Sequence, residues 1–102
     1  MIHVIAKITT KPGMRATVLE AFQDNMPAVH AEQGCIEYEP VIDASDAAAF
    51  QTEIGPDSFI VVEKWQTMDN LQAHAKSPHM AAYGAKVGDM IDDRAVYVLT
   101  AV

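Results

Sequence analysis

Along this 102-residue chain, apolar residues recur every second position in some stretches and about every 3.6 positions in others. The first spacing is typical of strands and the second of helices. Four stretches have a strand-like pattern, at residues 2–8, 35–43, 59–66 and 94–102. In the first stretch, one face carries only apolar residues, namely Ile2, Val4, Ala6 and Ile8. The stretch at 59–66 has the strongest pattern and is apolar on both faces near its start. These stretches predict the main strands of a sheet.

The first helical stretch begins at Met14, where apolar residues start to recur every three or four positions. Gly34 is well placed to end this helix, because glycine readily takes the left-handed conformation common after helix ends. Pro27 lies inside the stretch and cannot donate a backbone hydrogen bond to the carbonyl of Gln23. We therefore expect a kink or a break near Gln23.

Two shorter helices are predicted in the second half of the chain. Thr67 is a suitable N-cap for the first of them. Ser77 and Pro78 then restart a helix with serine as the cap and proline at the first helical position. Between the second and third main strands, residues 44–49 predict a loop of small residues and residues 50–54 predict a short additional strand.

The order of these segments is strand–helix–strand, a small strand insertion, then strand–helix–helix–strand. This order predicts a doubled βαβ unit, which is an α+β, ferredoxin-like sandwich with helices on one face of an antiparallel sheet. The length of the chain supports a single domain over residues 1–102. Ile60 and Val62 would lie on the face of the sheet that the helices cannot cover. A second copy packed sheet to sheet would bury them, so we expect a homodimer.

Composition excludes several classes of partner. Fourteen acidic against seven basic residues give a net charge of −7, which would repel nucleic acid, and the basic residues form no patch. No apolar run reaches the roughly 20 residues needed to span a bilayer, and the alternating N-terminus does not resemble a signal peptide. We expect a cytoplasmic protein that binds neither nucleic acid nor membranes. The single cysteine, Cys35, is interpreted as a small buried apolar residue.

Glu63, Trp65 and His74 are the residues best suited to carry chemistry. Glu63 and Trp65 are two positions apart on a predicted strand and share a face, where a carboxylate is costly to bury unless it is paired. His74 lies on the apolar stripe of a helix that would meet the same space. It could act as a general base toward a phenolic proton, with Glu63 orienting it. The alternative is a core histidine with a single hydrogen-bond partner.

Trp65 and His79 also have two interpretations each. Trp65 is either a pocket wall whose indole N–H serves as a polar handle, or a core residue. His79 lies at a predicted helix N-terminus, where the helix dipole disfavours its charged form, and it could hydrogen-bond to a ligand or be an ordinary surface histidine. His74 and His79 are five residues apart with Pro78 between them, which is a poor metal spacing, so no metal site is expected.

Several segments resemble the antibiotic biosynthesis monooxygenase family in order and spacing across nearly the whole chain. They are Val4-Ile5-Ala6, Lys11-Pro12-Gly13, Gly34-Cys35 leading to Tyr38, Pro56-Asp57-Ser58, Glu63-Lys64-Trp65, Leu71-Gln72-Ala73-His74, and Ser77-Pro78-His79-Met80 followed by Tyr83. Within the family, the pattern is most similar to that of bacterial quinol monooxygenases. The resemblance implies a dimeric α/β-barrel arrangement of the ferredoxin-like fold.

The resemblance also implies oxygenation of a small aromatic substrate by dioxygen without flavin, haem or metal. An electron-rich quinol can reduce dioxygen once it is deprotonated, so the protein needs only to remove a proton and exclude water. On this basis His74 and Glu63 are the expected catalytic residues, and no cofactor is expected. The expected substrate-binding residues are Tyr38, Trp65, His79 and Tyr83.

Other activities of the family are alternatives. Its haem-degrading members use an asparagine on the first strand and a histidine on the last helix, where this chain has Ala6 and a residue near Gly84. This departure argues against haem cleavage. An isomerase acting on a small polar metabolite and a non-catalytic, dimeric ligand-binding module both remain open at the level of sequence.

Overall fold

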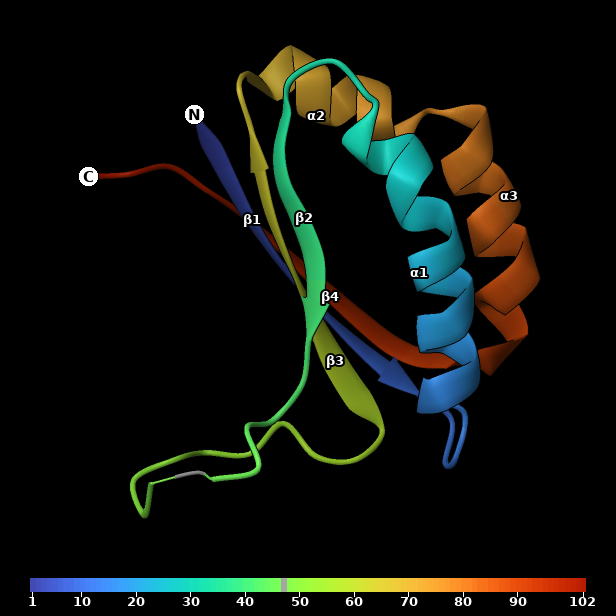
Figure 1. Cartoon of the computed structure of the whole chain (residues 1–102), viewed down its shortest axis with the longest axis vertical. Coiled ribbons are helices and arrows are strands. Elements are labelled where there is room, and N and C mark those ends of the chain that lie inside the picture. Colours follow the sequence, from blue (N-terminus) through green and yellow to red (C-terminus); the bar gives the residue numbers. More distant parts are fainter. Residues whose placement is uncertain (47) are drawn as a thin grey trace.

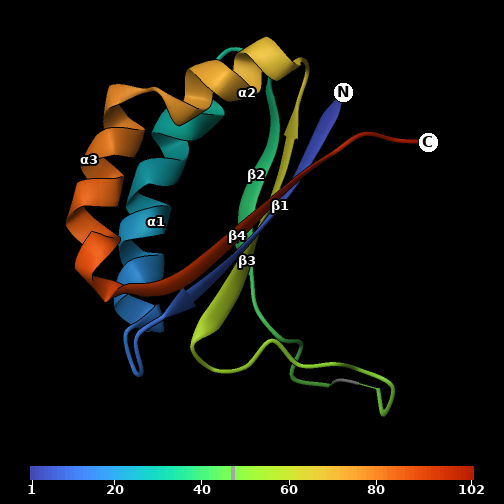
Figure 2. The same cartoon turned by 180° about the vertical axis from the view of Figure 1, so that it is seen from behind.

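The computed structural model describes residues 1–46 and 48–102 as a layer of helices packed on a single sheet (Figure 1). In chain order the elements are β1 (Ile2–Thr10), α1 (Arg15–His30), β2 (Cys35–Val41), β3 (Ser58–Trp65), α2 (Met68–Ala75), α3 (Pro78–Val87), the short 3-10 helix η1 (Gly88–Met90) and β4 (Ile91–Leu99). The strand order is β2-β3-β1-β4, and each neighbouring pair is antiparallel. All three α-helices lie on one side of the sheet (Figure 2). The predicted α+β, ferredoxin-like fold is confirmed.

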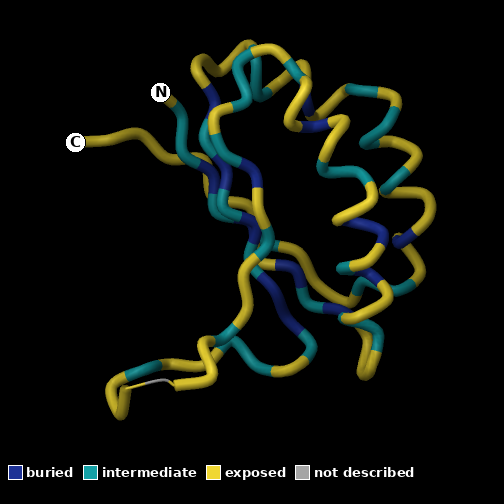
Figure 3. Tube along the Cα trace, in the orientation of Figure 1, coloured by how far each residue is buried: buried dark blue, intermediate teal, exposed yellow. Residues whose placement is uncertain are grey.

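The core lies between the sheet and α1. As predicted, Val4, Ala6 and Ile8 of β1 are buried on one face of the sheet. The register pairs Val4 with Glu63 of β3 and with Val98 of β4, so these three residues share the face that points toward the helices. The buried residues of α1 are Val18, Ala21, Phe22 and Val29. Figure 3 shows the buried segments of the sheet and of α1 facing each other across this interior.

Helix α1 runs without interruption from Arg15 to His30 and contains Pro27 in its last turn. The break expected near Gln23 is therefore wrong, whereas a kink there stays a prediction. Pro27 removes only the hydrogen bond to the carbonyl of Gln23, and only three residues of the helix follow it. Val29, two residues further on, is fully buried, so its packing holds the last turn in place. The helix ends at His30, four residues before Gly34.

The connection between β2 and β3 contains no strand in its described residues, so the short strand predicted at 50–54 is wrong. The carboxylate of Asp43 organises the segment instead. It accepts hydrogen bonds from the backbone N–H groups of Ile54 and Gly55 at 3.0 and 2.9 Å, and from the side chain of Gln51 at 3.3 Å. A side chain therefore satisfies backbone donors that a strand partner would otherwise satisfy. Part of the loop predicted at 44–49 falls on Ala47, which lies outside the described residues.

Gly34 fixes how the turn between α1 and β2 meets α2. Its φ angle is +82°, in the left-handed region that glycine tolerates. A side-chain carbon at this position would overlap the side chain of Asn70. The backbone N–H of Asn70 donates to the hydroxyl of Thr67 at 3.1 Å, which confirms Thr67 as the N-cap of α2. This close approach positions the helix that carries His74.

Helix α3 begins after α2 where the sequence predicted, but its capping differs from the prediction. Pro78 is the first residue of α3, as predicted. The Ser77 side chain makes no capping hydrogen bond; its hydroxyl instead donates to the carbonyl of His74 at 2.8 Å. Strand β4 begins at Ile91 and ends at Leu99, so it starts and ends three residues earlier than predicted.

The face of the sheet opposite the helices carries apolar side chains. Ile60 and Val62 lie on it and are half-buried, whereas Tyr97 and Leu99 of β4 are 55% and 47% exposed. No part of the described chain packs over this face in either view (Figures 1 and 2). Among the described residues, no helix combines the length and the apolar character that spanning a membrane requires.

Candidate active site

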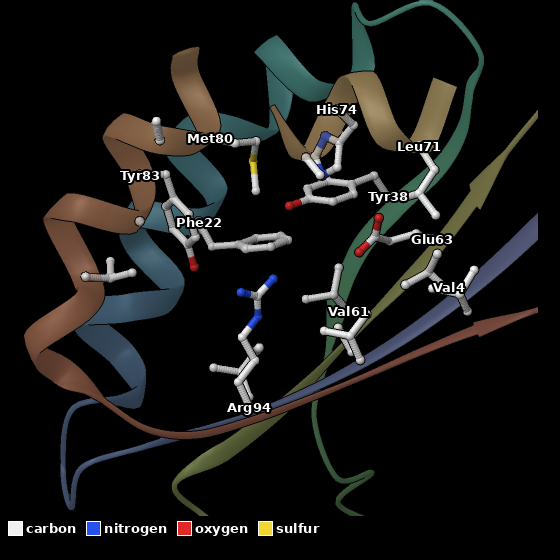
Figure 4. Close-up of a pocket in the computed structure, with 18 of the residues that line it drawn as sticks. Val4, Phe22, Tyr38, Val61, Glu63, Leu71, His74, Met80, Tyr83 and Arg94 are labelled. Atoms are coloured by element: carbon white, nitrogen blue, oxygen red, sulfur yellow. The ribbon is translucent and has the colours of Figure 1, made fainter. Parts of the chain in front are cut away.

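A cavity of about 660 Å³ lies between the sheet and the helices, within the size range of ligand pockets for small molecules. Most of its lining is aliphatic or aromatic, including Val4, Ala6, Phe22, Val61, Leu71 and Met80. The polar residues of the lining are Tyr38, Glu63, Gln72, His74, Tyr83 and Arg94. Figure 4 labels all of these residues except Gln72 and shows them converging from α2, α3 and the sheet. The cavity therefore suits a small, mainly apolar ligand that carries a few polar groups.

His74 is held by a carboxylate that the sequence did not suggest. Its Nδ1 lies 2.7 Å from Oε2 of Glu32, in the turn between α1 and β2. The expected pairing of His74 with Glu63 is thus not found. Since an ionised carboxylate can only accept, Nδ1 must be the donor, and a neutral imidazole then carries its lone pair on Nε2. His74 is 5% exposed and lines the cavity, so this lone pair belongs to a buried, fixed ring.

The same carboxylate binds the second histidine. Oε1 of Glu32 lies 3.0 Å from Nε2 of His79, at the start of α3. Nδ1 of His79 is buried and has no hydrogen-bond partner among the described residues. His79 does not line the cavity, so its expected place as a substrate-binding residue finds no support in the cavity's geometry. Glu32 instead connects the turn after α1 to both α2 and α3.

Glu63 has Trp65 as its partner. The indole N–H of Trp65 donates to Oε1 of Glu63 at 3.0 Å. Glu63 is 8% exposed, and burial raises the pKa of its carboxyl, an effect partly offset by the hydrogen bond from Trp65 and the positive charge of Arg94. The sequence requirement that a buried carboxylate be paired is therefore met. Glu63 lines the cavity and can contact a ligand there.

Trp65 lies behind His74 and is not part of the cavity lining. It is fully buried, and its ring centroid lies 4.7 Å from that of His74. The ring of Tyr38 contacts the same imidazole edge to face, at 5.4 Å. Trp65 thus packs as a support for the histidine, and its expected role as a wall of the pocket finds no support in the lining.

Tyr38 and Tyr83 both line the cavity, as expected. Their rings contact Phe22, with centroids 5.0 and 6.0 Å from it. Burial raises the pKa of the Tyr38 hydroxyl. Burial likewise raises the pKa of Tyr83 to about 12, although the positive charge of Arg94 acts in the opposite direction. Both phenols are therefore neutral hydrogen-bonding groups at physiological pH.

Sequence reasoning missed Glu32 and Arg94. Glu32 lies in a turn, far along the chain from His74, and no local pattern links the two residues. Arg94 could have been found from the strand register, because it pairs with Ile8 and therefore shares the inward face of the sheet. Within residues 1–46 and 48–102, no group of three or more His, Cys, Asp and Glu residues is placed to hold a metal ion.

Comparison with known proteins gives the class of this protein. The sequence matches the model of the family described as "antibiotic biosynthesis monooxygenase" over residues 1–86. The chain belongs to this family and is an enzyme of the monooxygenase type. It is 40% identical over 95 residues to a protein of Escherichia coli (strain K12) named "probable quinol monooxygenase YgiN", and the match covers 90% of each chain.

Solved structures show the same fold. PA3566 from Pseudomonas aeruginosa superposes with a TM-score of 0.80 at 20% identity, covering 99% of this chain and 93% of that one. Rv0793 from Mycobacterium tuberculosis superposes with a TM-score of 0.79 at 24% identity, covering 99% and 94% of the two chains. At these identities the likeness establishes the architecture and leaves the substrate open.

Proposed function

We propose that this enzyme is a cofactor-independent monooxygenase that acts on a quinol or a related small aromatic hydroxyl compound. The observation that carries the proposal is the hydrogen bond between Glu32 and His74. It places a proton on Nδ1 and leaves a basic Nε2 on a histidine that lines a largely apolar cavity. The name of the Escherichia coli relative supports the same class of substrate.

The proposed reaction begins when His74 takes a proton from a quinol hydroxyl. The quinolate is electron-rich enough to reduce dioxygen directly, and the apolar lining keeps water away from the reacting anion. A carbon–oxygen bond forms at an unsubstituted ring carbon, the O–O bond then breaks, and the second oxygen atom leaves as water. The quinol is oxidised to a hydroxyquinone, so the substrate supplies all the electrons. His74, Glu63, Tyr38 and Tyr83 are the groups positioned to hold the oxygen atoms.

The proposed working unit is a homodimer joined through the uncovered face of the sheet. Ile60, Val62, Tyr97 and Leu99 give that face an apolar surface. A twofold partner packed sheet to sheet would bury this surface on both copies at once. Sedimentation at micromolar concentration tests the proposal, and a monomer would contradict it.

The experiment that tests the activity measures oxygen consumption with a panel of reduced naphthoquinones against matched autoxidation blanks. Wild type, His74→Ala and Lys11→Ala are compared after treatment with a chelator. Lys11 is exposed between β1 and α1, away from the cavity and from the proposed dimer interface, and serves as the control. Catalysed uptake that persists in the control and is lost in His74→Ala supports the proposal. Isotope-labelled dioxygen should deliver one atom to the product.

Uptake equal to the blank across the panel would contradict the proposal. Turnover of a polar metabolite without oxygen uptake would then favour an isomerase. Quinone binding without turnover would favour a ligand-binding module.

A further inference from the structure

Arg94 brings a positive charge into the cavity. It lies on β4 opposite Ile8 of β1, on the face of the sheet that points toward the helices. Figure 4 shows its guanidinium extending from the sheet toward Phe22 and Tyr83. None of the ion pairs in the described part of the chain involves Arg94. A guanidinium is always charged and offers a planar set of donors, so this one is available to a ligand.

Arg94 and His74 approach the cavity from opposite sides. Arg94 extends from β4, whereas His74 extends from α2 on the helix side (Figure 4). Apolar side chains, among them Val61 and Met80, line the space between them. Arg94 is exposed as well as part of the lining, so it lies where the cavity meets solvent. A ligand with its reacting hydroxyl at His74 would direct its far end toward Arg94.

The charge of Arg94 is unusual for its surroundings. The chain carries a net charge of −7, which disfavours the approach of any anion. Arg94 is the one lysine or arginine among the described residues that line the cavity, and its positive charge opposes the rise that burial causes in the pKa of Tyr83. A planar guanidinium binds a carboxylate through two parallel hydrogen bonds, which fixes orientation as well as affinity.

We propose that Arg94 determines substrate specificity by binding an anionic substituent, with the chemistry of a carboxylate, at the end of the aromatic substrate opposite its reacting hydroxyl. This inference rests on the proposed function, and it narrows the substrate class from neutral quinols to aromatic hydroxyl compounds that carry an acidic group. This charge preference follows from the position of one side chain.

The test measures equilibrium binding by calorimetry without dioxygen, so that turnover plays no part. The probes are 6-hydroxy-2-naphthoate, whose hydroxyl and carboxylate lie at opposite ends of the ring system, and 2-naphthol, which lacks the carboxylate. Wild type, Arg94→Gln and Lys11→Gln are compared. Lys11 is exposed between β1 and α1 and is not part of the cavity lining, so its variant removes the same charge away from both the cavity and the proposed dimer interface.

Wild type should bind the naphthoate more tightly than the naphthol. Arg94→Gln should weaken naphthoate binding by about 10- to 100-fold, as expected for the loss of charged hydrogen bonds, and should leave naphthol binding nearly unchanged. Lys11→Gln should bind both probes like wild type. An equal loss for both probes in Arg94→Gln, or no loss for the naphthoate, would overturn the inference. Because binding is measured without turnover, this failure is distinct from an absence of oxygen uptake.

Discussion

Replacing Glu32 by glutamine should move the ring proton of His74 from Nδ1 to Nε2. In the native site the carboxylate accepts from His74 Nδ1 and from His79 Nε2 at once. An amide at this position has one accepting oxygen and one donating nitrogen, so it cannot accept from both rings. One of the two histidines must therefore present a lone pair to the amide nitrogen. Its proton then moves to the other ring nitrogen.

The surroundings decide which histidine changes. If His79 accepts from the amide, its proton must move to Nδ1, which is buried without a partner in the described structure. If His74 accepts, its proton moves to Nε2, on a ring that lines the cavity. A buried unpaired donor costs up to about 3 kcal/mol, and an unpaired acceptor is better tolerated. We therefore expect His74 to change, favoured by about 1–2 kcal/mol, which corresponds to a factor of roughly 5–30.

Only the minority form would keep a basic Nε2, so kcat for oxygen uptake should fall by that factor of roughly 5–30, with KM nearly unchanged. His79→Ala alone should retain most of the activity. The double variant Glu32→Gln/His79→Ala should recover much of the lost kcat, because the amide oxygen is then free to accept from His74. It makes fewer hydrogen bonds than the single variant and should unfold at a lower temperature. Activity in the double variant no higher than in Glu32→Gln would refute the reasoning.

Three further predictions concern stability and assembly. Burial raises the pKa of Glu63 above its usual 4.5, so the stability that its protonated form contributes is complete below that pH and is lost as the pH rises through the raised value. Glu63→Gln does not titrate. In urea melts, its free energy of unfolding should therefore increase relative to that of wild type as the pH is raised from acid to neutral. Gly13→Ala and Gly34→Ala both place alanine at positive φ, at a cost of about 1–2 kcal/mol. Only Gly34→Ala also overlaps Asn70, so it should lower the free energy of unfolding more than Gly13→Ala does. Equal free energies of unfolding for the two variants would contradict the packing described here. Val62→Asp should shift the sedimenting species from dimer to monomer, and an unchanged dimer would mean that another surface forms the interface.

The main elements of the fold could be predicted because their signals are local. The alternation in β1 and β3 assigned each residue to a face, and the register confirms that Val4 and Glu63 share the inward one. The strand predicted at 50–54 failed for a tertiary reason, because the Asp43 carboxylate binds the backbone N–H groups of Ile54 and Gly55. A hydrophobic pattern cannot show that a side chain elsewhere has already satisfied those donors.

The site could be predicted only as a set of side chains, without their pairing. Periodicity predicted that Glu63 and His74 face the same space, and both residues line the cavity. It could not assign hydrogen bonds, because those depend on how a turn approaches a helix. Glu32 reaches His74 because Gly34, two residues later, lets the turn pack against α2. The partner of the histidine is therefore set by a glycine that carries no chemistry.

Two methionines in the cavity wall affect how long the enzyme would remain intact. Met68 and Met80 both line the cavity, and the sulfur of Met80 accepts a hydrogen bond from the Asn25 amide at 3.4 Å. Thioethers are readily oxidised to sulfoxides, which are polar and disrupt apolar packing. Peroxide released from an uncoupled turnover would form beside these sulfurs. The chemistry proposed for the cavity would therefore limit the active lifetime of the enzyme. Sulfoxide at Met80 should accumulate with the number of turnovers rather than with the age of the protein.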